Sequence, residues 1–393
     1  MKRRTFLAST AATAAALSSP LYAAAKPHRV AIIGHTGRGN YGHGIDTVWL
    51  EFEQTKICGV ADPNPTGLTQ AQTRLKTSAG FQDYRKMLAQ VQPDIVAICP
   101  RHVDQHHAMC LAAIDSGARG IYLEKPFCRT PREADEIKAA CKSKNVKLAV
   151  AHRNRYHPAL KAIDTMIASD QLGKILEIRG RGKGDRRGGA EDLWVLGTHV
   201  LDLVHYFGGK PLSCSAVLQQ DGKRVTPADV ITGNEGLGPL AGNALHARYQ
   251  MEKGFPAYFD SIANDGTQNA GFGLQLIGSR GIISIRNDRF PLAHFVPGNP
   301  FLATDTPRPW IPITSAGPGK PEPLENLNHL VGHHIYLVQD LLTSIEQDRQ
   351  PICGVQEAAM TVEMVNAVFA SHVAGSRAVP IPLEERDNAL ASW

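Results

Sequence analysis

Two short motifs carry side chains that could transfer a proton or hydrogen-bond a hydroxyl group. One is EKP at 124–126, in which Lys125 directly follows an apolar, strand-like run, 121–123. Open α/β sheets bind their ligands at the carboxyl edge of such strands. The other is GTH at 197–199, where His199 opens a predicted helix, a position that suits general acid–base work near neutral pH. Taken separately, each has a plainer interpretation, an exposed Glu–Lys pair for the first and a helix-capping or core histidine for the second.

A glycine-rich turn follows another apolar strand in the sequence VAIIGHTGRG at 30–39. Strand, glycine turn and helix together present free N–H groups and a helix dipole to a pyrophosphate, and a helix is predicted to begin near 41–44. The dinucleotide fingerprint places glycine at three positions, and Thr36 replaces the middle one. We assign the pyrophosphate contacts to this turn, at Gly34, Thr36, Gly37, Arg38 and Gly39.

Asp62 ends the next predicted strand, 56–61, where a carboxylate accepts hydrogen bonds from ribose hydroxyls. A carboxylate there favours NAD, because it would repel the 2′-phosphate of NADP. Arginines elsewhere in the fold could reverse that preference, so NADP stays possible. The alternative is an α/β domain with an incidental Asp-Pro turn.

The elements that position these motifs fall into two groups. Up to residue 151, apolar strands alternate with helices, which predicts a doubly wound parallel sheet. The predicted strands are 29–33, 56–61, 94–98, 120–123 and 146–151, and the predicted helices are 66–76, 83–91, 104–116 and 131–144.

After residue 152 the pattern changes to strands with period-two alternation, which predicts an open, mostly antiparallel sheet with one face covered. The predicted strands are 174–182, 212–220, 244–252, 256–263, 273–278 and 281–286, and the predicted helices are 160–169, 198–207, 328–347 and 355–373. The Pro- and Gly-rich segment 291–325 is interpreted as a long excursion outside the core.

The N-terminus, MKRRTFLAST and an Ala-, Ser- and Thr-rich run to residue 25, fits a twin-arginine export signal. We therefore expect the twin-arginine export machinery to deliver the folded chain, from about Lys26 onward, to the periplasm or the extracellular space. The run is too short and too polar to span a membrane, and no cysteine follows it for a lipid anchor. The alternative is a merely basic N-terminus.

The composition argues against several classes of partner. The net charge is +5, and loss of the three basic residues in the signal lowers it to +2. A chain so nearly balanced gives no reason to expect nucleic acid or a membrane surface as a partner. The seven scattered cysteines form no disulfide framework or zinc pair. His102 and His106 have helical spacing but no third ligand nearby in sequence, so we expect no metal.

In this order, the motifs resemble those of the glucose–fructose oxidoreductase, inositol dehydrogenase and MocA-type (Gfo/Idh/MocA) family. The matching features are the glycine turn, Asp62, the strand ending at Pro100, EKP, HRNRYHP at 152–158 and GTHVLD at 197–202. The resemblance implies a Rossmann domain, 26–151, and an α/β domain, 152–393, whose large open sheet often mediates homo-oligomers. It also implies hydride transfer between NAD(P) and a carbon of a small carbohydrate or polyol.

By matched position, the resemblance makes Lys125 and His199 the substrate-binding and proton-transfer pair. It places the nicotinamide region near Pro100, His107, Glu124, Pro126 and His152. One departure is Val195, which stands where family members usually carry an aspartate four residues before the histidine. Asp192 or Asp202 is then left to supply a carboxylate.

Sugar contacts are expected from two further stretches, because polyhydroxylated ligands need many hydrogen bonds and a flat apolar platform. One stretch is 183–194, for which the alternative is a solvated charged loop, and the other begins at Arg153. The substrate-binding candidates are Arg153, Arg155, Tyr156, Asp185, Arg186, Asp192, Trp194 and Asp202.

Three functions remain open at this level. The first is a sugar or polyol oxidoreductase, whose coenzyme would be retained and recycled internally because little free dinucleotide exists outside the cytoplasm. The second is a glycoside hydrolase that oxidises its substrate transiently and cleaves by elimination. The third is a non-catalytic nucleotide- and sugar-binding sensor, against which the presence of both Lys125 and His199 argues.

Overall fold

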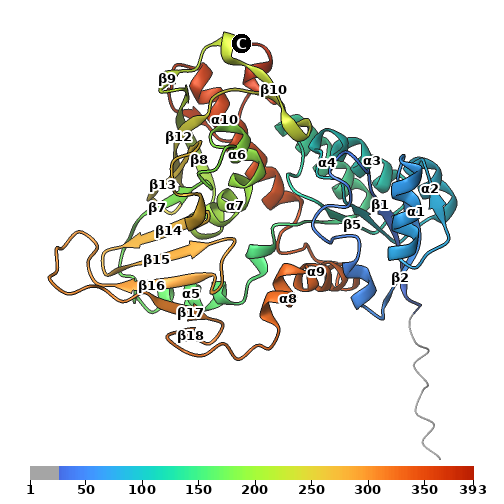
Figure 1. The fold of residues 1–393 in the computed structure, drawn as a ribbon, viewed down its shortest axis with the longest axis horizontal. Helices are drawn as coiled ribbons and strands as arrows, with labels where there is room; N and C mark the ends of the chain where they lie inside the picture. The colour runs from blue at the N-terminus through green and yellow to red at the C-terminus, as the bar shows by residue number, and fades with distance from the viewer. Residues whose placement is uncertain (1–25) are drawn as a thin grey trace, which may run out of the picture.

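The computed structural model describes residues 26–393, and the predicted export signal, 1–25, lies outside them. Two sheets form the core (Figure 1), a six-stranded one and an eleven-stranded one. The prediction of a parallel, doubly wound sheet followed by a large, mostly antiparallel sheet is confirmed. No helix among the described residues has the length and hydropathy needed to cross a bilayer.

The first sheet is parallel throughout and has the strand order β3-β2-β1-β4-β5-β6 of a dinucleotide-binding fold. Strands β4, β5 and β6 are buried along their whole length, which explains their unbroken apolar sequences. The strands are β1 (His28–Ile33), β2 (Thr55–Ala61), β3 (Gly80–Phe81), β4 (Ile95–Ile98), β5 (Gly120–Leu123) and β6 (Lys147–Val150). The helices between them are α1 (Pro65–Arg74), α2 (Tyr84–Val91), α3 (His106–Asp115) and α4 (Pro131–Lys144).

The prediction of a helix directly after the glycine turn is wrong. Between β1 and β2 the chain forms successive turns and only a short 3-10 helix, η1 (Val48–Glu51). Four glycines within eight residues take positive φ angles there, a conformation that an α-helix cannot contain. They are Gly37, Gly39, Gly42 and Gly44. A pyrophosphate at this turn therefore meets backbone and side-chain donors without the N-terminus of a following helix.

The second sheet has the order β18-β17-β16-β15-β14-β7-β13-β12-β8-β19, with β9 also paired to β8. Within the described chain its pairings are antiparallel except that of β7 with β13. Its main strands are β7 (Ile175–Arg181), β8 (Pro211–Gln220), β12 (Ala244–Met251), β13 (Pro256–Ile262), β14 (Gly273–Gly278) and β15 (Gly281–Arg286). The shorter strands are β9 (Lys223–Arg224) and β19 (Val379–Pro380). Helices α7 (Gly197–Gly208) and α10 (Val355–Val373) pack on this sheet.

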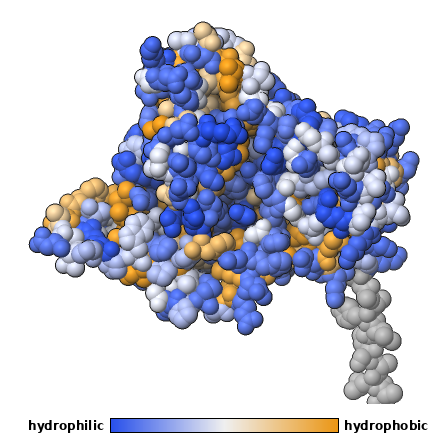
Figure 2. Space-filling model, viewed as in Figure 1, coloured by the Kyte–Doolittle hydropathy of each residue, from blue (hydrophilic) through white to orange (hydrophobic). Residues whose placement is uncertain are grey.

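The segment 291–325 is not wholly outside the core, contrary to prediction. It adds β16 (Ala293–Pro297), β17 (Ile311–Thr314) and β18 (Gly317–Pro318) to one edge of the second sheet. These strands are too short and too rich in proline and glycine to show a period-two pattern. The loop between β16 and β17 projects at the left of Figure 1, and Figure 2 shows hydrophobic residues exposed on that projection.

The C-terminal helices return to the first sheet. Helix α9 (Ile335–Glu346) packs on β5 and β6, and α10 packs on α4. The backbone of Cys353 accepts a hydrogen bond from the Val150 N–H, at 3.1 Å. The two sheets are thereby joined, and the carboxyl ends of β5 and β6 face elements from the second half of the chain.

Candidate active site

Lys125 and His199 line one cavity of about 220 Å³, as the sequence predicted that they would converge. Lys125 follows β5 and His199 lies in the first turn of α7. Gly197 lets α7 approach β13, because a Cβ there would lie 2.9 Å from the ring of Phe259. Glu124 and Arg153, also predicted site residues, line the same cavity.

Val195 stands at the position where family members usually carry an aspartate, and it contributes its backbone carbonyl to the site. The Lys125 ammonium donates a hydrogen bond to the backbone carbonyl of Val195, at 2.9 Å. Lys125 is 7% exposed, so this contact fixes a nearly buried ammonium and leaves two of its three N–H donors for a ligand. The carbonyl thus orients Lys125 where the resemblance leads one to expect a carboxylate.

The electrostatics favour a neutral imidazole beside a charged pair. Burial first, and then the charge of Lys125, hold the pKa of His199 well below its usual range. Burial also lowers the pKa of Lys125, although Glu124 opposes that shift. Burial would raise the pKa of Glu124, but a hydrogen bond from His43, at 2.8 Å, and the charge of Lys125 lower it overall. His199 is therefore a proton acceptor at neutral pH.

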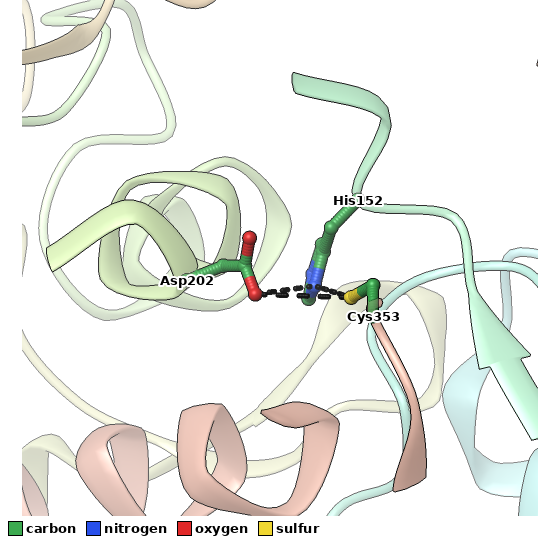
Figure 3. Close-up of side chains that lie close together, drawn as sticks. All are labelled: His152, Asp202 and Cys353. Atoms are coloured by element: carbon green, nitrogen blue, oxygen red, sulfur yellow. Dashed lines mark hydrogen bonds and ion pairs between the residues drawn. The ribbon is translucent and has the colours of Figure 1, made fainter. Parts of the chain in front are cut away.

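His152, Asp202 and Cys353 form a buried cluster, and Figure 3 shows these three side chains. The cluster lies next to His199. The Asp202 Oδ1 atom is 3.7 Å from His152 Nδ1 and 3.8 Å from Cys353 Sγ. Arg155 donates to the same Oδ1 at 3.0 Å. Burial raises the pKa of Asp202, but Arg155 together with His205 and His152 lowers it overall. The ring of His152 meets that of His199 edge-on, with centroids 5.3 Å apart. The cluster fixes the wall against which His199 packs.

The structure does not bring Arg155, Tyr156 and Asp202, three of the predicted sugar contacts, into the lining of the cavity that holds Lys125 and His199. Asp202 is 1% exposed and is engaged by Arg155. Tyr156 donates its hydroxyl to Asp340 at 3.0 Å and accepts from the Cys353 N–H. The residues of this cluster are of metal-ligand type, but the Arg155 guanidinium already bonds the oxygen that would face an ion. The expectation of no metal stays a prediction.

The loop 183–194, where sugar contacts were predicted, contributes one residue to the cavity, although it is not one of the eight named candidates. Lys183 lines it, whereas Asp192 is buried and accepts from Ser261 Oγ at 2.6 Å. Trp194 is fully buried and Asp185 is paired with Arg187. Arg186 is exposed at a separate depression of the surface. Arg153 is one of the eight predicted sugar contacts and lines the cavity, whereas the other seven are not in its lining.

Besides Ala151 and Leu196, five residues that line the cavity were not among the predicted site residues. None belongs to a motif, and they come together from segments more than 200 residues apart. They are His43, Lys183, Phe272, Asp288 and His334. The imidazole of His334 is held by Tyr122, whose hydroxyl lies 2.6 Å from His334 Nδ1.

At the nucleotide end, the ribose contact of Asp62 stays a prediction, and the Asp62 carboxylate is fully buried. Thr36, the departure from the fingerprint, contacts that carboxylate. Its hydroxyl donates to Asp62 Oδ2 at 2.7 Å, and its N–H lies 3.1 Å from both carboxylate oxygens. The Asn64 N–H also donates to Asp62, at 2.9 Å.

The remaining nucleotide-side groups fit an anionic, hydroxyl-rich ligand. Several buried polar atoms there have no hydrogen-bond partner among the described residues, which points to a bound group. They are Arg38 Nε, Arg101 Nε, His102 Nδ1, Asp104 Oδ1 and Gln105 Oε1. Gly37 has a φ of +87° and open space where a Cβ would stand, so backbone can approach a phosphate closely. Two guanidiniums and this turn suit a pyrophosphate.

His106, whose helical spacing from His102 was the reason to consider a metal, ties the nicotinamide-side loops together. His106 is fully buried between the carbonyls of Pro100 and Pro126, at 2.7 Å from each. It fixes the ends of β4 and β5 relative to one another. The neighbouring His107, which was predicted to contact the coenzyme, instead pairs with Glu136 on α4 at 2.7 Å.

A segment of the second half of the chain crosses to this nucleotide end (Figure 1). We call it the strap, residues 231–240, comprising β10 (Ile231–Gly233), η5 (Asn234–Gly236) and β11 (Gly238–Leu240). Glu235 pairs with Arg101 at 3.4 Å, and Gly236 packs directly against Asp104. Asp104 in turn binds Arg38 at 2.6 Å.

Comparison with known proteins agrees with this geometry. Two family models match the chain, an oxidoreductase family NAD-binding Rossmann fold over residues 28–152 and the C-terminal α/β domain of the same family over 149–382. A levoglucosan dehydrogenase of Pseudarthrobacter phenanthrenivorans is 28% identical over 175 residues, 40% of this chain and 44% of the relative. A D-glucoside 3-dehydrogenase of Escherichia coli is 27% identical over 206 residues, 47% of this chain and 55% of the relative.

The chain thus matches about half the length of these curated relatives. A solved levoglucosan dehydrogenase in complex with NADH and levoglucosan superimposes with a TM-score of 0.72 at 19% identity, covering 91% of this chain and all of that one. A dehydrogenase of Bordetella pertussis in complex with NADH and UDP-GlcNAcA has a TM-score of 0.66 at 16% identity and covers 91% and 100%. The chain therefore belongs to the Gfo/Idh/MocA oxidoreductase family, and its first sheet is that family's NAD-binding Rossmann domain.

Proposed function

We propose that this protein is an exported, NAD-dependent dehydrogenase of a secondary hydroxyl on a sugar, polyol or glycoside. One observation carries the proposal, namely that a neutral, buried imidazole and a nearly buried ammonium line one cavity at the carboxyl edge of the Rossmann sheet. Relatives named for their action on levoglucosan, D-glucosides and scyllo-inositol support a polyhydroxylated ring as the substrate class.

Lys125 and His199 together remove the proton of the substrate hydroxyl. The two free N–H donors of Lys125 hydrogen-bond the substrate oxygen and stabilise the negative charge that develops on it. His199, neutral because of burial, accepts the hydroxyl proton. NAD, when bound, supplies the hydride acceptor, so the alcohol loses one proton and one hydride and becomes a carbonyl. Arg153, Lys183 and Asp288 line the same cavity and provide donors and an acceptor for the other hydroxyls.

The strap supports a retained coenzyme. It lies against the nucleotide-side groups through Glu235 and Gly236, and Asn388 near the C-terminus holds it through a 3.0 Å hydrogen bond to the Pro239 carbonyl. A coenzyme under this segment is released only when the contacts with Arg101 and Asp104 separate. We therefore propose a redox-neutral cycle, in which a second sugar or the product itself restores the coenzyme, and assembly of copies through the open face of the large sheet.

The test is to purify the protein, release any bound dinucleotide by denaturation, and identify it by mass. The intact protein is then incubated with monosaccharides, polyols and aryl glycosides while reduced nicotinamide is followed by absorbance. We expect bound NAD and reduction by at least one sugar, lost in Lys125→Ala but kept in the surface control Lys174→Ala. Cleavage of an aryl glycoside without net NADH would favour the oxidation–elimination hydrolase. A protein that holds no nicotinamide coenzyme and accepts none would contradict the proposal.

A further inference from the structure

We propose that a second cavity beside the one at Lys125 and His199 binds a second sugar ring, so that the preferred ligand is a disaccharide or larger glycoside. This inference rests on the proposed function and names its substrate class more narrowly. The second cavity measures about 520 Å³, more than twice the volume of the first. It lies between the end of η3 (Arg153–Tyr156), the turn after β15, β17 and helix α8 (Leu327–Gly332).

The two cavities are neighbours because three chain segments each line both. The η3 region gives Arg153 to the first and His157 to the second, and the turn after β15 gives Asp288 and Phe290 respectively. The α8–α9 junction gives His334 to the first and His329 to the second. Separations of two to five residues along such segments amount to roughly 7 Å. One molecule with two linked rings can therefore reach both cavities.

A buried hydrogen bond joins two of the three shared segments. Asn154 of η3 donates to the backbone carbonyl of Asn287 at 3.1 Å. The side chain of Asn287 is 4% exposed, and it lines neither cavity. This contact fixes the η3 region relative to the turn after β15, so the residues that these two segments give to each cavity keep their spacing.

His157 supplies the strongest single indication. It is 4% exposed and lines the second cavity. Its Nδ1 atom accepts the Ala159 N–H at 3.1 Å, so the proton of the neutral ring resides on Nε2. Burial lowers the pKa of His157 to about 4, which keeps the ring neutral. In the part of the chain that the structure describes, this Nε2–H donor is buried without an acceptor.

The rest of the lining matches the two faces of a sugar ring. Phe290 and Leu324 offer an apolar platform at the mouth, where they are 54% and 38% exposed, and Figure 2 shows hydrophobic residues reaching the surface in this lower part of the molecule. Burial would raise the pKa of Glu322, but hydrogen bonds from Ser315 outweigh it and lower the pKa. The ionised Glu322 accepts hydrogen bonds from hydroxyls and repels phosphorylated or acidic ligands. A neutral sugar ring meets both requirements.

The experiment compares D-glucose with cellobiose, maltose and trehalose by calorimetric titration of the coenzyme-loaded protein. We expect at least one disaccharide to bind about tenfold more tightly than glucose. Phe290→Ala should remove most of that advantage and leave glucose binding unchanged. Phe301→Ala is the matched control, since Phe301 is 71% exposed on the same excursion and lies outside the lining of the cavity. His157→Asn, which keeps an acceptor near the Ala159 N–H but removes the Nε2 donor, should act like Phe290→Ala.

Equal affinity for glucose and all three disaccharides, or equal weakening of both by Phe290→Ala, would overturn the inference. A change of sedimentation coefficient in Phe290→Ala would also overturn it, because it would show that a second copy covers the cavity. Oxidation of glucose without any disaccharide advantage leaves the proposed dehydrogenase intact and removes only the second subsite. Disaccharide binding that depends on Phe290, without NADH formation or cleavage, supports the subsite and contradicts the dehydrogenase.

Discussion

Both ends of the cleft hold buried polar atoms without partners among the described residues, and they differ in the ion pairs that a ligand meets. At the nucleotide end, side chains bond one another, as Thr36 does with Asp62 and Arg101 with Glu235 of the strap. At the catalytic end, several buried atoms have no partner among the described residues. These are His199 Nδ1, Glu124 Oε2, Asp288 Oδ1 and His334 Nε2.

This difference bears on how each ligand exchanges. At the catalytic end, a sugar hydroxyl can bond these free atoms without displacing the hydrogen bonds of Glu124 with His43 and of His334 with Tyr122. In the proposed retention, a dinucleotide shares Arg38 and Arg101 with Asp104 and Glu235, and the strap separates from η2 (Val103–Gln105) when the dinucleotide leaves. The sugar should therefore exchange quickly and the coenzyme slowly, as a retained coenzyme requires. Four measurements test this difference between the two ends of the cleft, and they follow in order of decreasing expected effect.

The largest effect is expected at the catalytic end. His199→Ala should lower kcat about a thousandfold, since loss of a positioned general base costs roughly 10²- to 10⁴-fold. Coenzyme content, measured on the denatured protein, should stay at the wild-type level. His246→Ala is the control, because His246 pairs with Asp260 on the large sheet, at 2.6 Å, outside the cavity. Wild-type turnover in His199→Ala would remove His199 from the mechanism.

The wall behind His199 comes next. Asp202→Asn leaves the Arg155 guanidinium buried without its counter-charge, so the free energy of unfolding in urea should fall by about 4 kcal/mol. Asp170→Asn breaks an exposed ion pair of similar length, 2.7 Å to Arg280, and should cost under about 1 kcal/mol. If both substitutions cost the same, the cluster in Figure 3 does not support the catalytic end.

Acid should destabilise the catalytic end through its buried histidines. Burial lowers the pKa of His152 and of His334 to about 4 in the folded chain, against about 6.5 when unfolded. The unfolded chain then binds more protons between these values, so stability is full above pH 6.5 and falls as the pH drops toward 4. Each histidine contributes up to roughly 3 kcal/mol of this loss.

Urea unfolding at pH 7, 6, 5 and 4.5 measures this slope. His334→Gln removes one titrating group, so its stability should depend less steeply on pH than that of the wild type. A slope unchanged by His334→Gln would mean that His334 titrates alike in the folded and unfolded chains.

The smallest effect is expected at the strap. Glu235→Gln removes a half-exposed ion pair worth about 0.5–1 kcal/mol, so bound coenzyme should dissociate two- to fivefold faster. The KM for the sugar should not change. The control is Glu177→Gln, which breaks an exposed pair with Arg179, at 2.9 Å, on the large sheet. Dissociation as slow as in the wild type would separate the strap from coenzyme retention.

Sequence reasoning succeeded where a regular element carries the residue. Lys125 lies directly at the end of a strand and His199 at the start of a helix, so both motifs could be located in the sequence, and the family resemblance paired them. It did not foresee contacts with a tertiary partner. The carboxylate of Asp62 is bonded by Thr36, 26 residues away, and the carboxylate of Asp202 is bonded by Arg155, 47 residues away. Nothing local distinguishes such a buried carboxylate from one that faces a ligand.

The residues missed at the cavity have the same origin. His43, Phe272 and Asp288 belong to loops whose positions depend on the packing of both sheets, and loops carry no periodic pattern. The strap was missed for a further reason, since its contacts with Arg101 and Asp104 join segments more than 130 residues apart. The glycines between β1 and β2 were visible, yet their number weighed less in the prediction than the expected fingerprint.

The bridge between Ala149 and Gly354 has a consequence for biosynthesis. Strand β6 is the last in its sheet, and residues near Gly354 cover its outer edge, so this edge stays bare until the ribosome has made nearly the whole chain. An uncovered strand edge is a template for aggregation. We therefore expect truncation before residue 354 to yield insoluble protein.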